Sequence, residues 1–174
     1  TMLNFAASYF VRLCREFDTH IHIVHLSSSN SIETIKKAQS EGLPITVETC
    51  PQYLFFHAEA IPDGQTQYKC APPIREKANN ELLWQALQNG FFNFIASDHS
   101  PAPPSIKELD SGNFKKAWGG IAGLQFNLPV IWTKAKARGF SVSDISRLMS
   151  TQVASFLKME DRKGEIAKGF DADI

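Results

Sequence analysis

The chain has 174 residues, of which 43% are hydrophobic, and its 18 basic and 18 acidic side chains give a formal net charge of zero. This composition is typical of a soluble globular domain and argues against a disordered chain, a nucleic-acid partner and a membrane partner. A complete (β/α)8 barrel takes about 250 residues, so a chain of this length is too short to form one.

The three cysteines, Cys14, Cys50 and Cys70, are scattered and form no Cys-x-x-Cys pair. An odd, scattered set favours a reducing compartment over a disulfide framework. We therefore expect an intracellular protein, most simply a cytoplasmic one. The first residues do not have the pattern of a secretory signal, and an organellar signal ahead of the chain is left open.

The first quarter of the chain predicts a helix followed by a strand, a second helix and a second strand. Apolar residues at steps of three and four predict a helix over 2–17, and a β-branched run predicts a strand over 20–26. The next helix is expected to be capped by Asn30 and to stop at Gly42. A strand is predicted over 44–49. A strand, helix and strand within about 30 residues indicate a parallel βαβ crossover.

The middle of the chain contains two long loops on either side of one helix and one strand. Residues 50–77 show no strong periodicity and are expected to be irregular, which is typical of a functional loop or lid. A helix is predicted over 79–89 and a strand over 91–96. The strand is followed by residues 97–100, and the second long loop covers 101–120.

The last third of the chain predicts two or three helices. One covers about 121–138 and is expected to be divided at Pro129, and another covers about 141–158 with a break near Thr151. Ser141 is expected to cap the second of these helices. The tail, 164–174, predicts a turn that enters a strand.

His25 and Asp98 stand out because each follows a predicted parallel strand. Ligands and catalytic groups gather at the carboxyl edge of such sheets. Imidazole nitrogen and carboxylate oxygen are both ligands of zinc, and a carboxylate beside a metal can carry the proton of an activated water. A satisfied core histidine and a loop or helix-capping aspartate are the alternative interpretations. The two residues alone leave metal-assisted chemistry and a structural role both open.

Further residues in the strand and the loops bear on a binding site. His20 and His22 alternate along the first strand and are expected on the face opposite His25, against the outer helices or solvent. Prolines stiffen both long loops, and Gly119 permits close approach of the backbone to a ligand. Fixed backbone donors and acceptors suit a cyclic amide or imide, although simple loop rigidity explains the same prolines.

Four segments, in order along the chain, together resemble the cyclic amidohydrolases, the group that contains allantoinases, hydantoinases (dihydropyrimidinases) and dihydroorotases. Within this group the loops at 97–104 and 117–125 are most similar to those of allantoinases. Ala102 stands where a dihydroorotase has a second histidine, and Gly119 begins a Gly-Gly pair where a hydantoinase usually has Asn-Gly. The four segments are IVHLSS (23–28), VETCPQYL (47–54), KCAPPIR (69–75) and SDHSP (97–101).

The resemblance implies an α/β fold, namely a (β/α)8 TIM barrel of the amidohydrolase type, of which this chain is the C-terminal part. Residues 1–163 would supply about strands six to eight and the following helices, and 164–174 would begin a C-terminal strand or accessory β-domain. The resemblance also implies two divalent metals, commonly zinc. His25 would bind one metal, and Asp98 would bind the other and act as the catalytic proton carrier. Backbone groups near Ala71, where the family often has serine, and near Gly119 would bind the substrate.

The activity that the resemblance implies is hydrolysis of the cyclic amide bond of allantoin to allantoate, in purine catabolism. A bridging hydroxide would attack a ring carbonyl, and Asp98 would pass its proton to the leaving nitrogen. A hydantoinase-type or dihydroorotase-type enzyme and a non-catalytic scaffold are the alternatives. The family's other metal ligands, which include a His-x-His pair, cannot be placed in this chain. His20 and His22 have the His-x-His spacing, but they precede His25 on the same strand and so do not supply that pair. We expect the whole protein to be a homotetramer acting on a small cyclic ureide, and this chain alone to be inactive.

Overall fold

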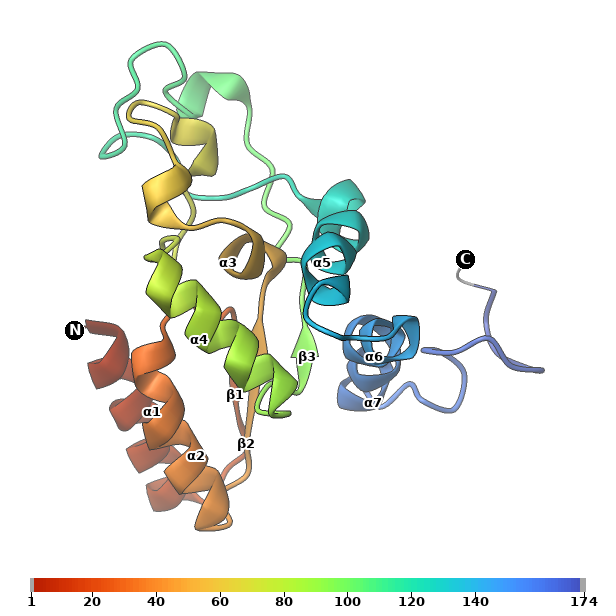
Figure 1. Cartoon of the computed structure of the whole chain (residues 1–174). Helices are drawn as coiled ribbons and strands as arrows, with labels where there is room; N and C mark the ends of the chain where they lie inside the picture. Colours follow the sequence, from red (N-terminus) through yellow and green to blue (C-terminus); the bar gives the residue numbers. More distant parts are fainter. Residues whose placement is uncertain (1, 173–174) are drawn as a thin grey trace.

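The computed structural model describes residues 2–172. Three parallel strands, β1 (Ile21–Ile23), β2 (Ile45–Thr49) and β3 (Phe94–Ile95), form a sheet in that order, with β2 in the centre (Figure 1). Ile23 pairs with Val47, and Thr49 pairs with Ile95. The predicted parallel crossover is therefore confirmed, because β1 and β2 are neighbours joined through a helix.

Seven helices accompany the sheet within the described residues. Helices α1, α2 and α4 lie along one side of it, and α5 to α7 lie beyond β3 (Figure 1). The helices are α1 (Met2–Phe17), α2 (Ile32–Ser40), α3 (Pro51–Phe55), α4 (Lys77–Gln88), α5 (Asn127–Lys136), α6 (Val142–Ser146) and α7 (Gln152–Phe156).

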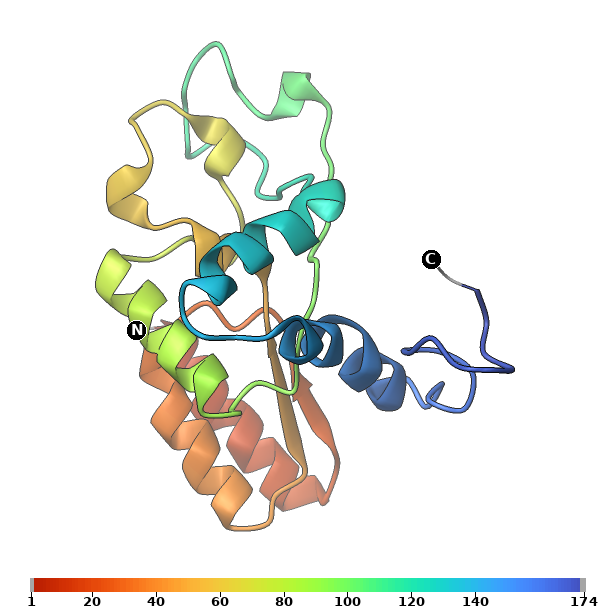
Figure 2. The ribbon, with the colours of Figure 1, turned by 45° about the vertical axis from the view of Figure 1, so that its right-hand side comes forward.

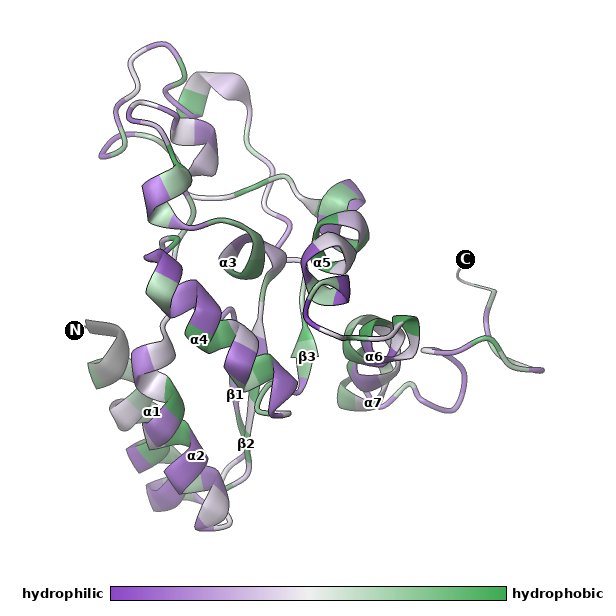
Figure 3. Ribbon diagram, viewed as in Figure 1, coloured by the Kyte–Doolittle hydropathy of each residue, from purple (hydrophilic) through white to green (hydrophobic). Residues whose placement is uncertain are grey.

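The core lies between the sheet and the first helices. Ile45 and Val47 of β2 are buried in one cluster with Ile35 of α2 and Leu83 of α4. Successive side chains of a strand point to opposite faces, so Thr46 and Glu48 lie on the other face. Figure 3 shows hydrophilic and hydrophobic residues mixed along α1, α2 and α4, as expected of helices that bury one side only.

The segment after β1 differs from its prediction. The strand ends at Ile23 rather than at residue 26, because His25 adopts a left-handed φ of 39° that a strand cannot continue through. Asn30 does not cap α2. A 3₁₀ turn, Ser29–Ser31, leads directly into the helix, and Ser31 occupies the N-cap position without a side-chain hydrogen bond. Gly42, with φ of 85°, follows the end of α2 as predicted.

Strand β3 is also shorter than the predicted 91–96. Phe91 and Phe92 are buried in the hydrophobic cluster instead of extending the ladder. Asn93 takes the next place, because its backbone N–H donates to the carbonyl of Val47 at 2.8 Å and its side-chain oxygen accepts from the N–H of Val47 at 2.7 Å. A side chain thus completes the pairing that a regular strand would make with its backbone.

The expectation that 50–77 is irregular is wrong at its beginning. Helix α3 forms at once after β2, with Pro51 in its first turn, where a missing N–H costs nothing. A five-residue helix such as α3 is too short to leave a periodic signal.

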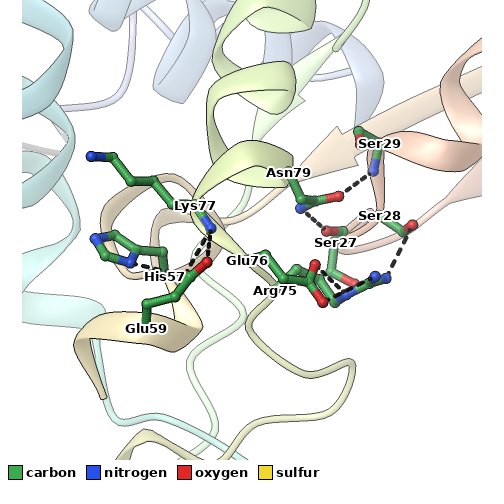
Figure 4. Close-up of polar contacts among 9 residues, drawn as sticks. All are labelled: Ser27, Ser28, Ser29, His57, Glu59, Arg75, Glu76, Lys77 and Asn79. Atoms are coloured by element: carbon green, nitrogen blue, oxygen red, sulfur yellow. Dashed lines mark hydrogen bonds and ion pairs between the residues drawn. The ribbon is translucent and has the colours of Figure 1, made fainter. Parts of the chain in front are cut away.

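The start of α4 is capped from outside the helix, since the carboxylate of Glu59 accepts from the backbone N–H of Lys77 at 2.9 Å (Figure 4).

The C-terminal helices confirm one prediction and correct two. Ser141 and Asp144 form a reciprocal capping box at the start of α6. Pro129 does not divide α5, because it lies in the first turn, where proline is tolerated. In place of a break near residue 151, a π-helical turn, Arg147–Thr151, joins α6 to α7.

The tail contains turns and no strand within 164–172, while the last two residues of the predicted strand lie outside the described part. The division of the chain at 163 therefore stays a prediction. Among the described residues, none of the helices combines the length and the apolar character that crossing a membrane requires.

Candidate active site

His25 and Asp98 lie just beyond β1 and β3, at the carboxyl end of the sheet where both long loops gather (Figure 2). Both have a left-handed backbone, with φ of 39° for His25 and 46° for Asp98. A side-chain-bearing residue adopts this region rarely and at a cost, and such residues cluster at active sites and ligand clamps. The structure thus brings the two predicted metal ligands to one edge of the sheet in the same unusual conformation.

Asp98 is half-buried and is bound by a neighbour that the sequence reasoning did not single out. Gln52 of α3 is buried, and its amide donates a hydrogen bond of 2.7 Å to Oδ2 of Asp98. Burial raises the pKa of Asp98 above its ordinary value, against the opposing effects of His25 and of the Gln52 hydrogen bond.

Glu48 of the central strand contacts two histidines, His22 of β1 and His25 just after it. The whole residue is only 9% exposed, and its Oε1 accepts from the backbone N–H of His25 at 3.3 Å. Its Oε2 lies 3.0 Å from Nε2 of His22. Glu48 was missed by the sequence reasoning, although an acidic residue inside an otherwise apolar strand is the signal that could have found it.

The expectation that His22 meets a helix is confirmed, but the helix is α7. The ring of His22 stacks on Phe94 of β3, with centroids 5.2 Å apart, and lies 4.4 Å from the ring of Phe156 in α7. His22 is therefore half-buried on the Glu48 face instead of contacting α1, α2 or solvent. His20 is exposed as expected, and its Nε2 lies 2.9 Å from the hydroxyl of Thr46. Both histidines are engaged within the sheet.

The loop that follows His25 is fixed by helix α4. Asn79, in the first turn of α4, donates to the carbonyl of Ser27 at 2.9 Å and accepts from the N–H of Ser29 at 2.8 Å (Figure 4). Arg75 donates to the hydroxyl of Ser28 at 3.4 Å from the same direction. These contacts hold the chain directly after the strained histidine. A single asparagine in a predicted helix gave no sequence signal for this role.

The two predicted substrate-binding residues, Ala71 and Gly119, lie side by side. A Cβ placed on Gly119 would come within 3.3 Å of the Cβ of Ala71 and 3.4 Å of its backbone nitrogen. Within the described part of the chain, neither residue's backbone N–H or C=O takes part in a hydrogen bond. The loop of Asp98 reaches this pair, because the N–H of Ser100 donates to the carbonyl of Ile121 at 3.1 Å.

A cavity of about 460 Å³ lies between α3, α5 and the second long loop, with Gln52 and Gly120 in its wall. Its lining is mostly apolar and includes neither His25 nor Asp98, nor Ala71 or Gly119. The cavity therefore does not coincide with the candidate site, which is open at the edge of the sheet.

The residues present fit part of a metal site. His25 and Asp98 supply one imidazole and one carboxylate, which are donor types that zinc and similar cations accept. No group of three histidine, cysteine, aspartate or glutamate side chains within residues 2–172 is arranged to hold a metal ion. The three cysteines are buried and free, so they offer no thiolate site either. A complete centre needs further donors from outside these residues.

The sequence of this chain matches the model of the Amidohydrolase family over residues 11–174. It is 47% identical over 160 residues to an allantoinase from Streptomyces avermitilis, covering 92% of this chain and 35% of that protein. A mitochondrial allantoinase from Aquarana catesbeiana is 49% identical over 142 residues, covering 82% of this chain and 29% of the relative. The structure is similar to that of a D-hydantoinase from Bacillus sp. AR9, with a TM-score of 0.89 and 33% identity, covering 98% of this chain and 38% of that one. The chain thus spans about a third of the length of the curated relatives it matches.

Proposed function

This chain belongs to the amidohydrolase family, and on that premise we propose that it forms part of an enzyme that hydrolyses the cyclic amide bond of allantoin to allantoate. The observation that carries the proposal is the pair His25 and Asp98. Both have a left-handed backbone conformation and follow the two outer strands of the parallel sheet at its carboxyl edge. The identity to allantoinases supports allantoin as the substrate.

Amidohydrolases are generally metal-dependent, and His25 and Asp98 are the residues of this chain that would hold the metal. A bound divalent metal supplies a water that is nucleophilic at neutral pH. We propose zinc as this metal. His25 would contribute an imidazole nitrogen, its position fixed through its backbone N–H by Glu48. Asp98 would contribute one carboxylate oxygen, oriented by the amide of Gln52.

Asp98 would also move the proton that hydrolysis requires. Cleavage of an amide needs a base for the attacking water and an acid for the leaving nitrogen, and one carboxylate can serve in both steps in turn. The Asp98 carboxylate is held in place for this transfer by the Gln52 amide. Its place at the edge of the sheet leaves it open to a substrate bound between the loops.

Ala71 and Gly119 would orient the substrate ring. A cyclic ureide presents amide N–H donors and carbonyl acceptors along its edge, and unbonded backbone groups are matched partners for such an edge. The backbone groups of these two residues are unbonded within the described part and neighbour each other. Because the contact is to the backbone, alanine at 71 in place of the family's usual serine would not remove it.

The remaining architecture is proposed from the coverage of the relatives. Residues 1–163 would supply about strands six to eight of a (β/α)8 barrel with the following helices, and 164–174 would begin an accessory β-domain. Exposed apolar side chains on α1, including Phe5 at 75% and Phe17 at 64% exposure, support a helix that packs against further protein. The complete enzyme would be a homotetramer, and the 174-residue chain alone would not turn over allantoin.

The second candidate is a hydantoinase-type hydrolase, which the similarity to a D-hydantoinase structure favours. Turnover of allantoin, hydantoin, dihydrouracil and dihydroorotate by the complete metal-loaded enzyme separates the two. Highest kcat/KM with allantoin supports our proposal. Highest kcat/KM with hydantoin or dihydrouracil replaces it with the second candidate. Metal bound without turnover of any of the four substrates would indicate a non-catalytic scaffold.

A further inference from the structure

Lys107 is a buried lysine that has no acidic partner among residues 2–172. The residue is 7% exposed, and its ammonium donates three hydrogen bonds, all to backbone carbonyls. The acceptors are the carbonyls of Lys69 at 3.0 Å, Trp118 at 3.1 Å and Gly120 at 2.8 Å. Burial of an ammonium is costly unless all of its donors are satisfied, so three convergent carbonyls amount to a built site for this cation.

The three acceptors belong to two loops that are distant in the sequence. Lys69 precedes Ala71 in the first loop, while Trp118 and Gly120 stand on either side of Gly119 in the second. The loops are further joined by the N–H of Gly120, which donates to the carbonyl of Lys69 at 3.0 Å, and by Nζ of Lys69, which donates to the carbonyl of Ala117. Lys107 therefore lies where the two loops meet.

This bonding divides the backbone groups of the two loops into two sets. The carbonyls of Lys69, Trp118 and Gly120 accept from the ammonium. Those of Ala71 and Gly119 themselves stay unbonded within the described part of the chain. Ala71 is exposed and Gly119 is half-buried, so both can be reached from outside.

We infer that Lys107 is a positioning residue, whose ammonium fixes the spacing of the two loops so that the free backbone groups of Ala71 and Gly119 match the edge of a cyclic amide. The inference rests on the proposed function, since it deepens the substrate-binding part of that site. Lys107 itself touches neither the reacting atoms nor the substrate. Its loss should therefore weaken substrate binding more than it slows the chemical step.

The test compares Lys107→Met, Lys107→Gln and wild type in the complete enzyme. Methionine keeps the length of the side chain but offers no donor, while glutamine offers two of the three. We expect KM for the preferred cyclic amide to rise about tenfold or more in the methionine variant, with an intermediate value for glutamine. The expected kcat and bound metal stay within about twofold of wild type. Lys115→Met, which removes an exposed lysine of the same loop, is the control and should leave KM unchanged.

Amide hydrogen exchange of the segments 69–71 and 117–120 supplies a readout that does not need activity. Faster exchange in both segments of Lys107→Met, but not of Lys115→Met, supports the inference even if wild type turns over none of the four substrates and the proposed function fails. Unchanged KM and unchanged exchange overturn it. A fall in kcat and bound metal with KM unchanged also overturns it. If neither variant at residue 107 folds while the control does, the lysine serves folding and the positioning role is rejected.

Discussion

Gly119 packs directly against Ala71, with room for no more than a hydrogen between them: a Cβ on Gly119 would lie 3.3 Å from the Cβ of Ala71. This contact joins two loops that the sequence separates widely. Adding or removing one methyl group at residue 71 or 119 therefore tests the spacing of the two loops.

Gly119→Ala should force the two loops apart by a few tenths of an ångström. We expect about a tenfold loss in kcat/KM in the complete enzyme, because small misplacements of binding groups are costly in catalysis. Removing the opposing methyl group in the double variant Ala71→Gly, Gly119→Ala should restore part of that loss. Steady-state kinetics of both variants provide the measurement, and equal losses in the single and double variants would contradict the packing argument.

Asp98→Asn should abolish turnover while leaving the fold intact. The substitution keeps the shape of the side chain and its bond to Gln52, but it removes the charge and the proton carrier. We expect kcat to fall by about a hundredfold or more, with unchanged circular dichroism. A kcat close to that of wild type would reject the role assigned to Asp98.

Substitution of Gln52 should lower activity less than substitution of Asp98, because Gln52 acts through the Asp98 carboxylate. Gln52→Leu removes the 2.7 Å hydrogen bond to the carboxylate while preserving the bulk of a buried side chain. Loss of a partner that orients a metal ligand typically costs about 10–100-fold in metal affinity or activity. The matched control is Gln85→Leu, at an exposed position on α4. Metal affinity, measured by titration, and kcat/KM should both fall in the Gln52 variant and stay unchanged in the control. If the two variants behave alike, the role assigned to Gln52 is rejected.

The parts of this structure that local patterns could predict are the ones that depend on local chemistry. Period and cap signals located α1, β2 and the box at Ser141, because each depends on residues within a few positions. The bends at His25 and Asp98 could not be foreseen, since a left-handed φ on a side-chain-bearing residue is imposed by its surroundings. Shortening of β3 likewise depends on the side chain of Asn93 pairing with a distant strand.

The same distinction between local patterns and long-range contacts applies to the candidate site. The sequence singled out His25 and Asp98 because strand ends are visible in a sequence, and their assignment as site residues stays a prediction. Sequence reasoning did not single out Glu48, Gln52, Asn79 and Lys107, which contact residues far away in the sequence through hydrogen bonds. Such bonds leave no periodicity, and only the folded chain shows that Lys107 joins the loops of Ala71 and Gly119.

The cysteines are expected to be unreactive in the folded chain. All three are buried, and burial raises the pKa of Cys70 to about 11, which leaves about one thiol in a thousand ionised at pH 8. Iodoacetamide at pH 8 should label none of them in the native protein and all three after unfolding in denaturant. Mass spectrometry of the native sample counts the labels, and rapid alkylation of Cys70 there would contradict its burial.

The capping box at α6 predicts a coupled change in stability and in one pKa. Oγ of Ser141 accepts from the N–H of Asp144 at 3.1 Å, and the Asp144 carboxylate accepts from the hydroxyl and backbone N–H of Ser141 at 2.6 and 2.8 Å. The side-chain bond from Ser141, followed by its backbone bond, lowers the pKa of Asp144. Ser141→Ala should cost about 1 kcal/mol in the free energy of unfolding and should raise that pKa toward its ordinary value.

The sign of the pH dependence follows from the direction of the shift. A carboxylate whose pKa is lower in the folded state stabilises the fold above the pKa of the unfolded chain, about 3.9, and loses that contribution as the pH falls through the folded value. The gap in stability between wild type and Ser141→Ala should therefore be full at pH 7 and narrower near pH 2, where the bond to the N–H of Asp144 alone remains. Denaturant unfolding at the two pH values measures it, with Ser143→Ala, exposed in the same turn, as the control. A gap that widens toward low pH would show that the Asp144 carboxylate does not take part in the cap.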